Sequence, residues 1–508
     1  MTTLIPKYEQ PGSTTVNRPI NLKLQEYVSV KDFGATGNGT TDDTAAIQAA
    51  WTWAISNGGA RIHLPNGTYL VTSAINITGA NNVTFEGDGI DNTIITSNST
   101  TANIFYDSGT SLWRTFRDFS IASSVTRTAG SYFYLTSEKR SQFEKLKLTG
   151  HFNGFNFLGF EQCWMSAVSI TTPSGASNSI ILGTPGTSGS GSNMMLDSLF
   201  LRGNNDITQN APTGLYGLNI TDCDAVFAVN CDIGGFVNSD MLINPTVRAA
   251  NHYFTQCFFD ATKSSNCVTM QGAGIKVETT FNGCWFASGG KLTGGSTEAC
   301  GLRATNNGSY RDIILTGCLF FNNNGTGFLI ETPNADFTIT GCKFNSNGAS
   351  GVTNRYGFWL SPATLSGVGP SLTGCVFSTN TPLDAAFTSN SNYYSATGCI
   401  FATGISNGSG GGSFSGNIDQ SVTSVASATT LVVSPNQTYV NVTGTTNIAG
   451  ITATFKNHVI SLHFNGVLTV IDASTNLQLA GNFITANNSQ LTLVCDGATW
   501  YEIGRSNN

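Results

Sequence analysis

Acidic side chains are scarce in this chain, and four of them have a spacing that suits acid–base chemistry. Only 30 of the 508 residues are Asp or Glu. Asp222 and Asp224 directly follow a predicted strand at 215–220, Asp240 begins the corresponding strand of the next repeat, and Glu331 lies on a later one. Two carboxylates roughly 5 Å apart, or about 6.5–9.5 Å apart, can hydrolyse a glycosidic bond. We rank the catalytic candidates as Asp222 and Asp224, then Asp240, then Glu331.

A structural interpretation competes with this one at every position. Asp is favoured at turns, where its carboxylate accepts local backbone hydrogen bonds, and both Asp222 and Asp224 flank a predicted corner. Asp232 and Asp260 lie on or just after another strand of the repeat, so we rank them below the four candidates.

Candidate binding residues are aromatic or cationic side chains on the same strands. Tyr216 and Trp359 face outward by strand alternation, where a flat ring can support a sugar, and Arg248 and Arg303 can reach acidic groups. The neighbouring pair His252–Tyr253, beside Arg248, keeps an alternative open. A basic side chain next to an arginine could abstract a proton from a uronate, which is the chemistry of a polysaccharide lyase.

The strands that must position these residues belong to a repeat. Six times a short apolar run reaches a Cys that is followed two residues later by Phe, and a seventh run has Ile in the last position. Successive Cys are 26, 27, 34, 24, 33 and 24 residues apart. A near-constant minimum with insertions of variable length is typical of a solenoid whose loops vary. The repeated cysteines are Cys231, Cys257, Cys284, Cys318, Cys342, Cys375 and Cys399.

A second apolar strand precedes the Cys run in each repeat. Alternation points Phe328 and Ile330 inward and leaves Arg303, Leu329 and Trp359 facing outward on one ladder, with Glu331 placed on it as well. This outward ladder is the predicted floor of a binding groove.

Composition narrows the classes of protein. Only 10% of the residues are charged, and 57 are Gly, which favours an all-β chain with many turns. A net charge of −7 argues against a nucleic-acid partner. No apolar run approaches the ~20 residues of a membrane span, and the start of the chain lacks the apolar region of a signal peptide. The twelve Cys are expected to be buried thiols, because equivalent Cys side chains stacked on neighbouring repeats do not have the geometry that a disulfide needs at every repeat. We expect no metal and no cofactor.

The segment 28–80 carries a family resemblance. Its pieces are Val30-Lys-Asp-Phe-Gly-Ala, a Gly37-Asn-Gly-Thr-Thr-Asp-Asp-Thr run and Leu64-Pro-Asn-Gly-Thr-Tyr-Leu. Between them lies one predicted helix, capped by Thr41, Asp42 or Asp43 and ended by Gly58-Gly59. This stretch resembles the start of the pectate-lyase-like right-handed β-helix superfamily. The resemblance implies that the helix plugs the open end of the stack.

Both ends of the chain resemble bacteriophage tailspikes and capsule or O-antigen depolymerases. The opening Thr2-Thr-Leu-Ile-Pro-Lys with Val16-Asn-Arg-Pro-Ile-Asn is similar to a short virion-attachment arm, and Leu491-Thr-Leu-Val-Cys-Asp-Gly-Ala-Thr-Trp-Tyr-Glu-Ile resembles a C-terminal domain of phage spikes. This resemblance implies a homotrimer on a virion, made in the host cytoplasm, that binds or cleaves a bacterial surface polysaccharide. It also implies docking of residues 1–27 on a phage tail or baseplate protein.

The expected fold class is all-β, a right-handed parallel β-helix of about 12 coils with an N-terminal capping helix and a C-terminal β-sandwich-like domain, as a homotrimer. The expected function is hydrolysis of a capsule or O-antigen by paired acids. A lyase and a non-cleaving adhesin remain the alternatives. The expected segments are an arm at 1–27, the first coils with the capping helix at 28–80, the β-helix at 81–405, a Gly/Ser linker at 406–413 and a C-terminal β domain at 414–508.

Overall fold

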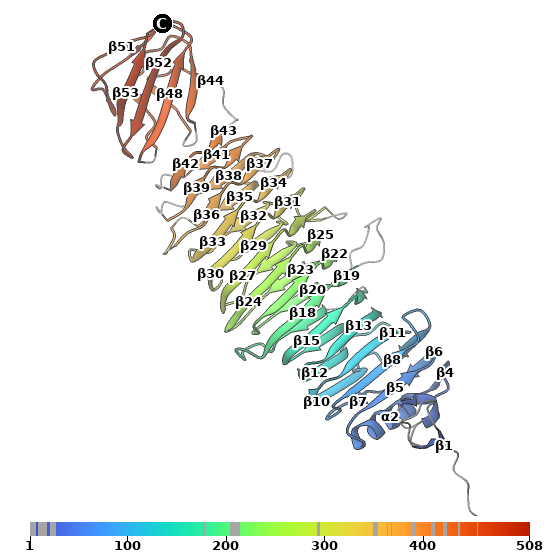
Figure 1. Ribbon diagram of the computed structural model, residues 1–508. Coiled ribbons are helices and arrows are strands. Elements are labelled where there is room, and N and C mark those ends of the chain that lie inside the picture. The colour runs from blue at the N-terminus through green and yellow to red at the C-terminus, as the bar shows by residue number, and fades with distance from the viewer. Residues whose placement is uncertain are drawn as a thin grey trace, which may run out of the picture. The chain divides into compact units, whose positions relative to one another are not determined.

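The computed structural model describes most of the chain (Figure 1). The described residues are 7–8, 18–20, 27–173, 175, 178–203, 214–291, 295–348, 354–362, 364–366, 368–388, 393–407, 412–419, 424–434, 437–454 and 456–507. Most of the expected arm and the centre of the expected linker, 408–411, therefore lie outside the described residues. The chain divides into two compact units, Met1–Asp260 and Ala261–Asn508, which are taken separately below.

The first unit begins with the predicted helix, α2 (Thr44–Ser56). The N-cap residue is Asp43, whose side chain makes no capping hydrogen bond. The preceding Asp42 carboxylate instead accepts hydrogen bonds from the backbone N–H and the hydroxyl of Thr44, at 3.0 and 2.5 Å. The buried face of the helix includes Trp51, which stacks on Phe85 and Phe116 with ring centroids 5.3 and 5.7 Å apart. The helix thus covers the apolar residues of the first coils, as an end cap of a solenoid must.

The remainder of the first unit is a parallel β-helix, in which each coil contributes strands to three faces that we call A, B and C. Residues on each face pair in parallel with the coil before and after. Short elements lead in: β1 (Lys7–Tyr8), β2 (Arg18–Pro19), β3 (Tyr27–Ser29) and the 3-10 helix η1 (Val30–Phe33). Face A holds β7 (Ile75–Asn76), β10 (Phe105–Leu112), β12 (Ser131–Lys139), β14 (Asn153–Phe157), β17 (Asn178–Leu182), β20 (Tyr216–Ile220) and β23 (Ser239–Ile243). Face B holds β5 (Ala60–Leu64), β8 (Val83–Gly87), β11 (Thr115–Ser123), β13 (Gln142–Thr149), β15 (Phe160–Ser166), β18 (Gly191–Asp197), β21 (Val226–Val229) and β24 (Arg248–Thr255). Face C holds β4 (Asn38–Asp42), β6 (Gly67–Val71), β9 (Thr93–Ser97), the C-terminal halves of β11 and β13, β16 (Ser169–Thr171), β19 (Phe200–Arg202), β22 (Asp232–Gly234) and β25 (Phe258–Asp260).

The second unit repeats this three-strand order. Its face A holds β26 (Val268–Met270), β29 (Leu302–Ala304), β32 (Phe328–Ile330), β35 (Tyr356–Leu360), β38 (Leu383–Phe387) and β41 (Ile405–Asn407). Face B holds β27 (Ile275–Asn282), β30 (Ser309–Thr316), β33 (Ala335–Thr340), β36 (Ser371–Thr373), β39 (Ser395–Thr397) and β42 (Ser413–Ser415). Face C holds β28 (Trp285–Ala287), β31 (Leu319–Phe321), β34 (Lys343–Asn345), β37 (Val376–Ser378), β40 (Ile400–Phe401) and β43 (Ile418–Asp419).

The Cys repeat marks the corner between faces B and C. The sequence suggested one strand that ends in Cys, whereas the structure breaks the strand at the preceding residue. In five repeats that residue is a Gly with φ of 60–62° (Gly283, Gly317, Gly341, Gly374 and Gly398). Only a left-handed backbone makes this turn, which explains the recurring Thr-Gly-Cys. All twelve thiols are free and buried, which confirms the predicted packing role.

The aromatic position that follows each Cys forms a ladder inside the second unit. Phe286, Phe320, Phe344, Phe377 and Phe401 stack with neighbouring ring centroids 4.6–4.8 Å apart. Successive rungs therefore repeat one side chain at one strand spacing, about 4.8 Å.

The C-terminal residues form a mixed six-stranded sheet in the order β44 (Ser424–Ala426), β46 (Tyr439–Thr443), β48 (His458–Phe464), β52 (Ser489–Cys495), β53 (Trp500–Ser506) and β50 (Leu477–Gln478). Two short sheets accompany it, β45 (Thr430–Leu431) with β47 (Gly450–Ile451) and β49 (Thr469–Val470) with β51 (Phe483–Ile484). Side chains of all three sheets share one apolar core around Trp500. The C-terminal segment thus contains a small mixed sheet, whereas β42 and β43, up to Asp419, still belong to the β-helix. In the described part of the chain, no helix combines the length and apolar character of a membrane span.

Candidate functional site

The outward ladder predicted on face A exists in the second unit. Thr269, Arg303, Leu329, Trp359 and Ala386 pair in register on β26, β29, β32, β35 and β38. The intervening residues of these strands point inward, which fixes the direction of the ladder. Leu329 faces outward yet is only 7% exposed, because neighbouring side chains cover it.

A pocket of about 210 Å³ opens beside this ladder, and we call it the arginine–tryptophan pocket. The Arg303 guanidinium binds the Glu331 carboxylate through two parallel hydrogen bonds of 2.8 and 3.0 Å. A second ion pair joins Arg355 to Glu298. The structure therefore brings together three of the predicted residues, Glu331, Arg303 and Trp359. The pocket is lined by Glu298, Cys300, Arg303, Thr326, Leu329, Glu331, Asn354, Arg355 and Trp359.

Trp359 forms part of the pocket wall. Its ring is half-buried and packs edge-on against Tyr356, with ring centroids 5.4 Å apart. Its indole Nε1 is buried and donates to no acceptor among the described residues. A buried indole N–H normally finds a partner, so this unpaired donor is unusual.

Two members of this pocket, Glu298 and Arg355, were not predicted. Glu298 lies in the long connection between β28 and β29, and Arg355 lies just before β35. Neither sits on a strand whose alternation could have pointed to it. Sequence reasoning could have found these two residues only if the length of each loop insertion specified which strands that loop packs against.

In the first unit, Asp222 is bound by two neighbouring loops. Its carboxylate accepts hydrogen bonds from Gly186 N (2.7 Å), Val247 N (2.6 Å) and Arg248 N (2.8 Å), and from Thr246 through its N–H and hydroxyl (3.2 and 2.5 Å). Burial raises the pKa of Asp222, and the hydrogen bonds outweigh it, so the pKa is lowered overall. This geometry gives Asp222 a structural function as a clamp between loops.

The neighbouring residues lie nearer the surface. Asp224 forms an ion pair with Arg248, Nη2 to Oδ2, of 3.2 Å. Tyr216 is half-buried on β20 and pairs in register with Ser239 of β23. Asp222, Asp224 and Arg248 are therefore together in one corner.

The residues of the lyase alternative separate in the structure. His252 is fully buried, and burial lowers its pKa to about 3, so the ring is neutral. Its Nδ1 accepts a hydrogen bond from Val226 N at 3.3 Å. Tyr253 points the other way, is 41% exposed and stacks on Phe227, with ring centroids 5.3 Å apart. His252 is thus placed as a core residue rather than as a base facing solvent.

Asp240 belongs to a group that we call the aspartate cluster: Arg202, Asp232, Asp240 and Asp260. Asp240 is fully buried. Burial raises its pKa well above the usual value, and the negative charge of Asp260 raises it further; the charge of Arg202 offsets this only in part. Asp240 therefore keeps its proton at a pH at which an ordinary aspartate has lost it.

The outer face of the cluster is built by register on face C. Phe200, Asp232 and Phe258 pair in one row across β19, β22 and β25, and Arg202, Gly234 and Asp260 pair in the next. Both phenylalanines are 44% exposed. Arg202 lies over the Phe200 ring, 4.9 Å from its centroid, and pairs with Asp232 at 2.5 Å.

Gly234 makes room for this arrangement. A Cβ at that position would lie 2.4 Å from the Arg202 Nη1 and 2.2 Å from the Asp260 carbonyl oxygen. Any larger residue at position 234 would clash with the Arg202 guanidinium and displace it from its place beside Asp232 and Asp260. From the sequence, Asp232 and Asp260 were ranked low and Arg202 was not considered. The three residues share a face only because strands of three separate repeats pair with one another.

Comparisons with known proteins agree with this fold. Residues 27–247 match the family described as rhamnogalacturonase A/epimerase, pectate lyase-like. Mannuronan C5-epimerase AlgE5 of Azotobacter vinelandii is 44% identical over 72 residues, which are 13% of this chain and 7% of that protein. Depolymerase 1, capsule K3-specific, of Klebsiella phage KP32 is 35% identical over 77 residues, which are 14% of this chain and 9% of that protein. The chain thus spans less than a tenth of the length of these curated relatives.

Among solved structures, tailspike protein 3 of bacteriophage CBA120 is similar, with a TM-score of 0.54 and 14% sequence identity. The match covers 85% of this chain and 69% of that chain. At this identity the likeness concerns the fold alone.

Proposed function

We propose that this chain binds and hydrolyses a bacterial surface polysaccharide, a capsule or O-antigen, as a phage tailspike. The match of residues 27–247 to a pectate-lyase-like family supports an activity on carbohydrate. The observation that carries the proposal is the aspartate cluster. It combines a proton-holding carboxyl group, two further aspartates and an arginine with two exposed aromatic rings in the same rows.

The cluster has the parts that glycosidic hydrolysis needs. Asp260 is half-buried at the surface and lies beside the proton held on Asp240, so we assign the proton donor to the Asp240–Asp260 pair. Asp232, paired with Arg202, is the carboxylate that activates water. Asp232 and Asp260 lie one strand and two residues apart, which corresponds to about 8 Å between Cα atoms. We therefore assign an inverting mechanism, in which the two carboxyl groups stand roughly 6.5–9.5 Å apart.

Phe200 and Phe258 lie on either side of Asp232 and offer apolar faces to the sugar rings next to the scissile bond. The arginine–tryptophan pocket of the second unit is a binding site for the same class of polymer, with Trp359 as platform and Arg303 as a cationic contact. Asp224 with Arg248, and Tyr216, are further proposed contacts for the chain. Glu331 with Glu298 is a second pair of carboxylates, each held by its own arginine, and ranks after the cluster for catalysis.

The assembly expectations belong to the same proposal. We propose a homotrimer that docks on a phage tail or baseplate protein through residues 1–27, with the C-terminal domain in trimerisation or glycan binding. Light scattering of the purified chain should give three times the monomer mass, and a monomer would contradict the trimer without touching the chemistry.

The test is a panel of purified capsules and O-antigens, with reducing ends and the ultraviolet absorbance of unsaturated products measured together. Hydrolysis gives reducing ends without absorbance. Asp232→Asn, Asp260→Asn and Asp240→Asn should each lower kcat by about 10²–10⁴-fold. Asp197→Asn, which changes an exposed aspartate on β18 outside the cluster, is the matched control. Reducing ends accompanied by absorbance would identify a lyase, and binding without either signal would identify an adhesin.

A further inference from the structure

A β-bulge interrupts face B of the second unit and shapes the surface there. Strands β27 and β30 share an irregularity in which Glu278 and Asp312 have φ of 50° and 53°. Between β30 and β33 the register shifts: Tyr310 pairs with Ala335 and Ile313 with Phe337, so three steps on β30 face two on β33. The bulge therefore ends at β33, and one residue of β30 has no partner there.

Asp336 occupies the place of the missing backbone partner. Its Oδ2 accepts a hydrogen bond from the Asp312 backbone N–H at 3.2 Å. This bond orients the Asp336 side chain, which is half-buried, and Oδ1 accepts no hydrogen bond from the residues that the structure describes.

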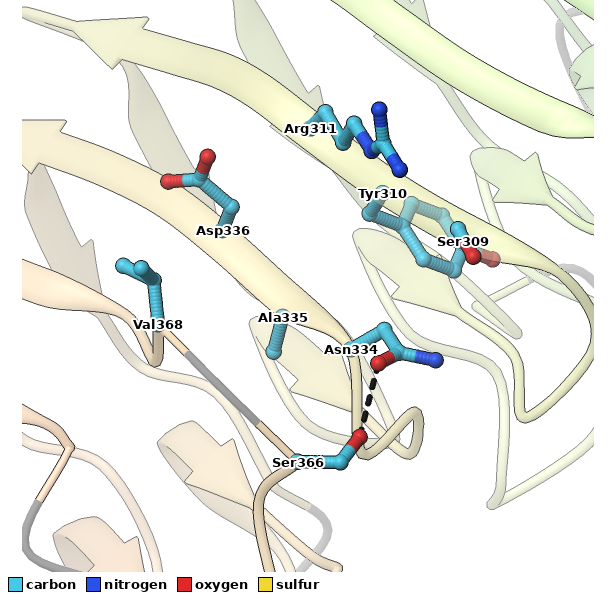
Figure 2. A pocket seen from close by; sticks show the side chains of 8 residues that line it. All are labelled: Ser309, Tyr310, Arg311, Asn334, Ala335, Asp336, Ser366 and Val368. Atoms are coloured by element: carbon cyan, nitrogen blue, oxygen red, sulfur yellow. Dashed lines mark hydrogen bonds between the residues drawn. The ribbon is translucent and has the colours of Figure 1, made fainter.

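The step between the two strands leaves a pocket of about 290 Å³, which we call the bulge pocket. Figure 2 shows Arg311 and Asp336 on adjacent strands, with Ser366 bonded to Asn334 across the pocket. The pocket is lined by Ser309, Tyr310, Arg311, Asn334, Ala335, Asp336, Ser366 and Val368.

The polar groups of the bulge pocket are arranged to bind a ligand. Arg311 is exposed and forms no ion pair with any residue that the structure describes. The Asn334 Oδ1 accepts from the Ser366 hydroxyl at 2.7 Å, which orients the amide so that its NH₂ group points elsewhere, without an acceptor in the described part of the chain. Val368 is 67% exposed and supplies an apolar edge. The pocket thus combines a free cation, a free amide donor and one carboxylate acceptor.

We propose that the bulge pocket binds one uronate residue of the polysaccharide; this rests on the proposed function. The Arg311 guanidinium, with its fork of N–H donors, takes the sugar carboxylate. Hydroxyl groups of the ring donate to Asp336 Oδ1 and accept from Asn334. Val368 contacts the C–H face of the ring. The substrate is therefore an acidic polymer, and the bulge pocket, rather than the aspartate cluster, recognises its uronate.

The test uses saturation-transfer NMR on the full chain with two matched probes, methyl β-D-glucuronide and methyl β-D-glucoside, which differ in the carboxylate. The wild-type protein should bind the glucuronide and not the glucoside. Arg311→Gln should weaken glucuronide binding by at least about tenfold, whereas Lys343→Gln, at an exposed cation on β34 of face C, should leave it unchanged. Arg311 is exposed, so its variant is expected to fold, and its melting temperature checks this.

Loss of glucuronide binding in Arg303→Gln, in the arginine–tryptophan pocket, with retention in Arg311→Gln would overturn the proposal and move the uronate to that pocket. Equal binding of both probes, or no binding of either, would overturn it as well. The proposed hydrolysis is judged separately by reducing ends from the polysaccharide panel, so binding at Arg311 without cleavage would reject the hydrolase and keep the bulge pocket.

Discussion

Asp240 and Asp260 share one electrostatic environment. Asp240 is fully buried on β23, and after burial itself the negative charge of Asp260 is the largest cause that raises the pKa of Asp240. Asp240 lies on β23 of face A and Asp260 at the end of β25 of face C, so the two side chains come from different faces of the β-helix, and only the winding of the chain makes them neighbours.

The first prediction follows from this pair. A folded-state pKa above the unfolded value means that the native protein binds the proton more tightly, so stability is fully present below the unfolded pKa, about 3.9, and falls as pH rises toward the folded pKa. Asp240→Asn removes the ionisable group. We expect the variant to melt at a higher temperature than wild type near neutral pH and at about the same temperature near pH 4, while its kcat falls.

Calorimetry across that pH range together with the reducing-end assay measures both effects. The matched control is Asp197→Asn, which should change neither. If Asp240→Asn were less stable than wild type by the same amount at every pH, the carboxyl group would be needed for packing, and its retention of a proton would not explain the effect.

The Asp222 clamp leads to the opposite pH dependence. Its pKa is lowered, because hydrogen bonds to the carboxylate outweigh burial. Stability from this group is therefore present above the unfolded pKa and lost as pH falls through the folded pKa. Asp222→Asn presents an NH₂ group to backbone donors, and we expect a cost on the order of 2–3 kcal/mol near neutral pH that shrinks in acid. Chemical unfolding at several pH values measures it, and an unchanged free energy of unfolding with lost activity would instead make Asp222 catalytic.

The free thiols give a prediction about redox state. All twelve Cys are buried and unbridged, and burial raises the pKa of Cys163 to about 12. Because the thiolate is the reactive form, we expect no reaction of the native chain with a disulfide reagent and reaction of all thiols after unfolding. A reductant should leave the melting temperature unchanged. Native protein that reacts quickly, or that loses stability on reduction, would contradict the buried-thiol ladder.

Much of the fold could be predicted because its signals are local and repeated. The Gly-Cys corner recurs in five repeats, and the stacked Phe side chains follow it in the same coils. Strand alternation predicted the ladder of Arg303, Leu329 and Trp359, which the register confirms. The interactions of Asp222 were out of reach, since its donors lie 36 residues before it and 24–26 after it, in loops of unequal length. The interpretation of Asp222 as a turn residue that accepts backbone hydrogen bonds was of the correct type, but it could not name the donors.

A ladder of asparagines was also missed, although it supports the same coils. Asn347 is fully buried; its Nδ2 donates to Phe320 O and Asn380 Oδ1 at 3.0 and 2.9 Å, and its Oδ1 accepts from Asn323 Nδ2 at 2.8 Å. Asn347→Leu should leave the neighbouring amides without partners and cost about 2–4 kcal/mol. Asn345→Ala, at the nearby end of β34, is the control, and equal unfolding free energies for the two variants would contradict the ladder.

Trp359 provides the prediction that separates binding from catalysis. Its ring borders the arginine–tryptophan pocket, and a half-buried tryptophan at the centre of a binding surface commonly contributes more than about 1 kcal/mol. We expect Trp359→Ala to weaken polysaccharide binding by about tenfold, which is ~1.4 kcal/mol, and to raise KM while kcat stays within about twofold of wild type. Trp164→Ala, at a tryptophan 39% exposed on β15, is the matched control and should leave both constants unchanged. If Trp359→Ala lowered kcat and left KM unchanged, the pocket would belong to the reacting centre, and catalysis would move from the aspartate cluster to Glu331 and Glu298.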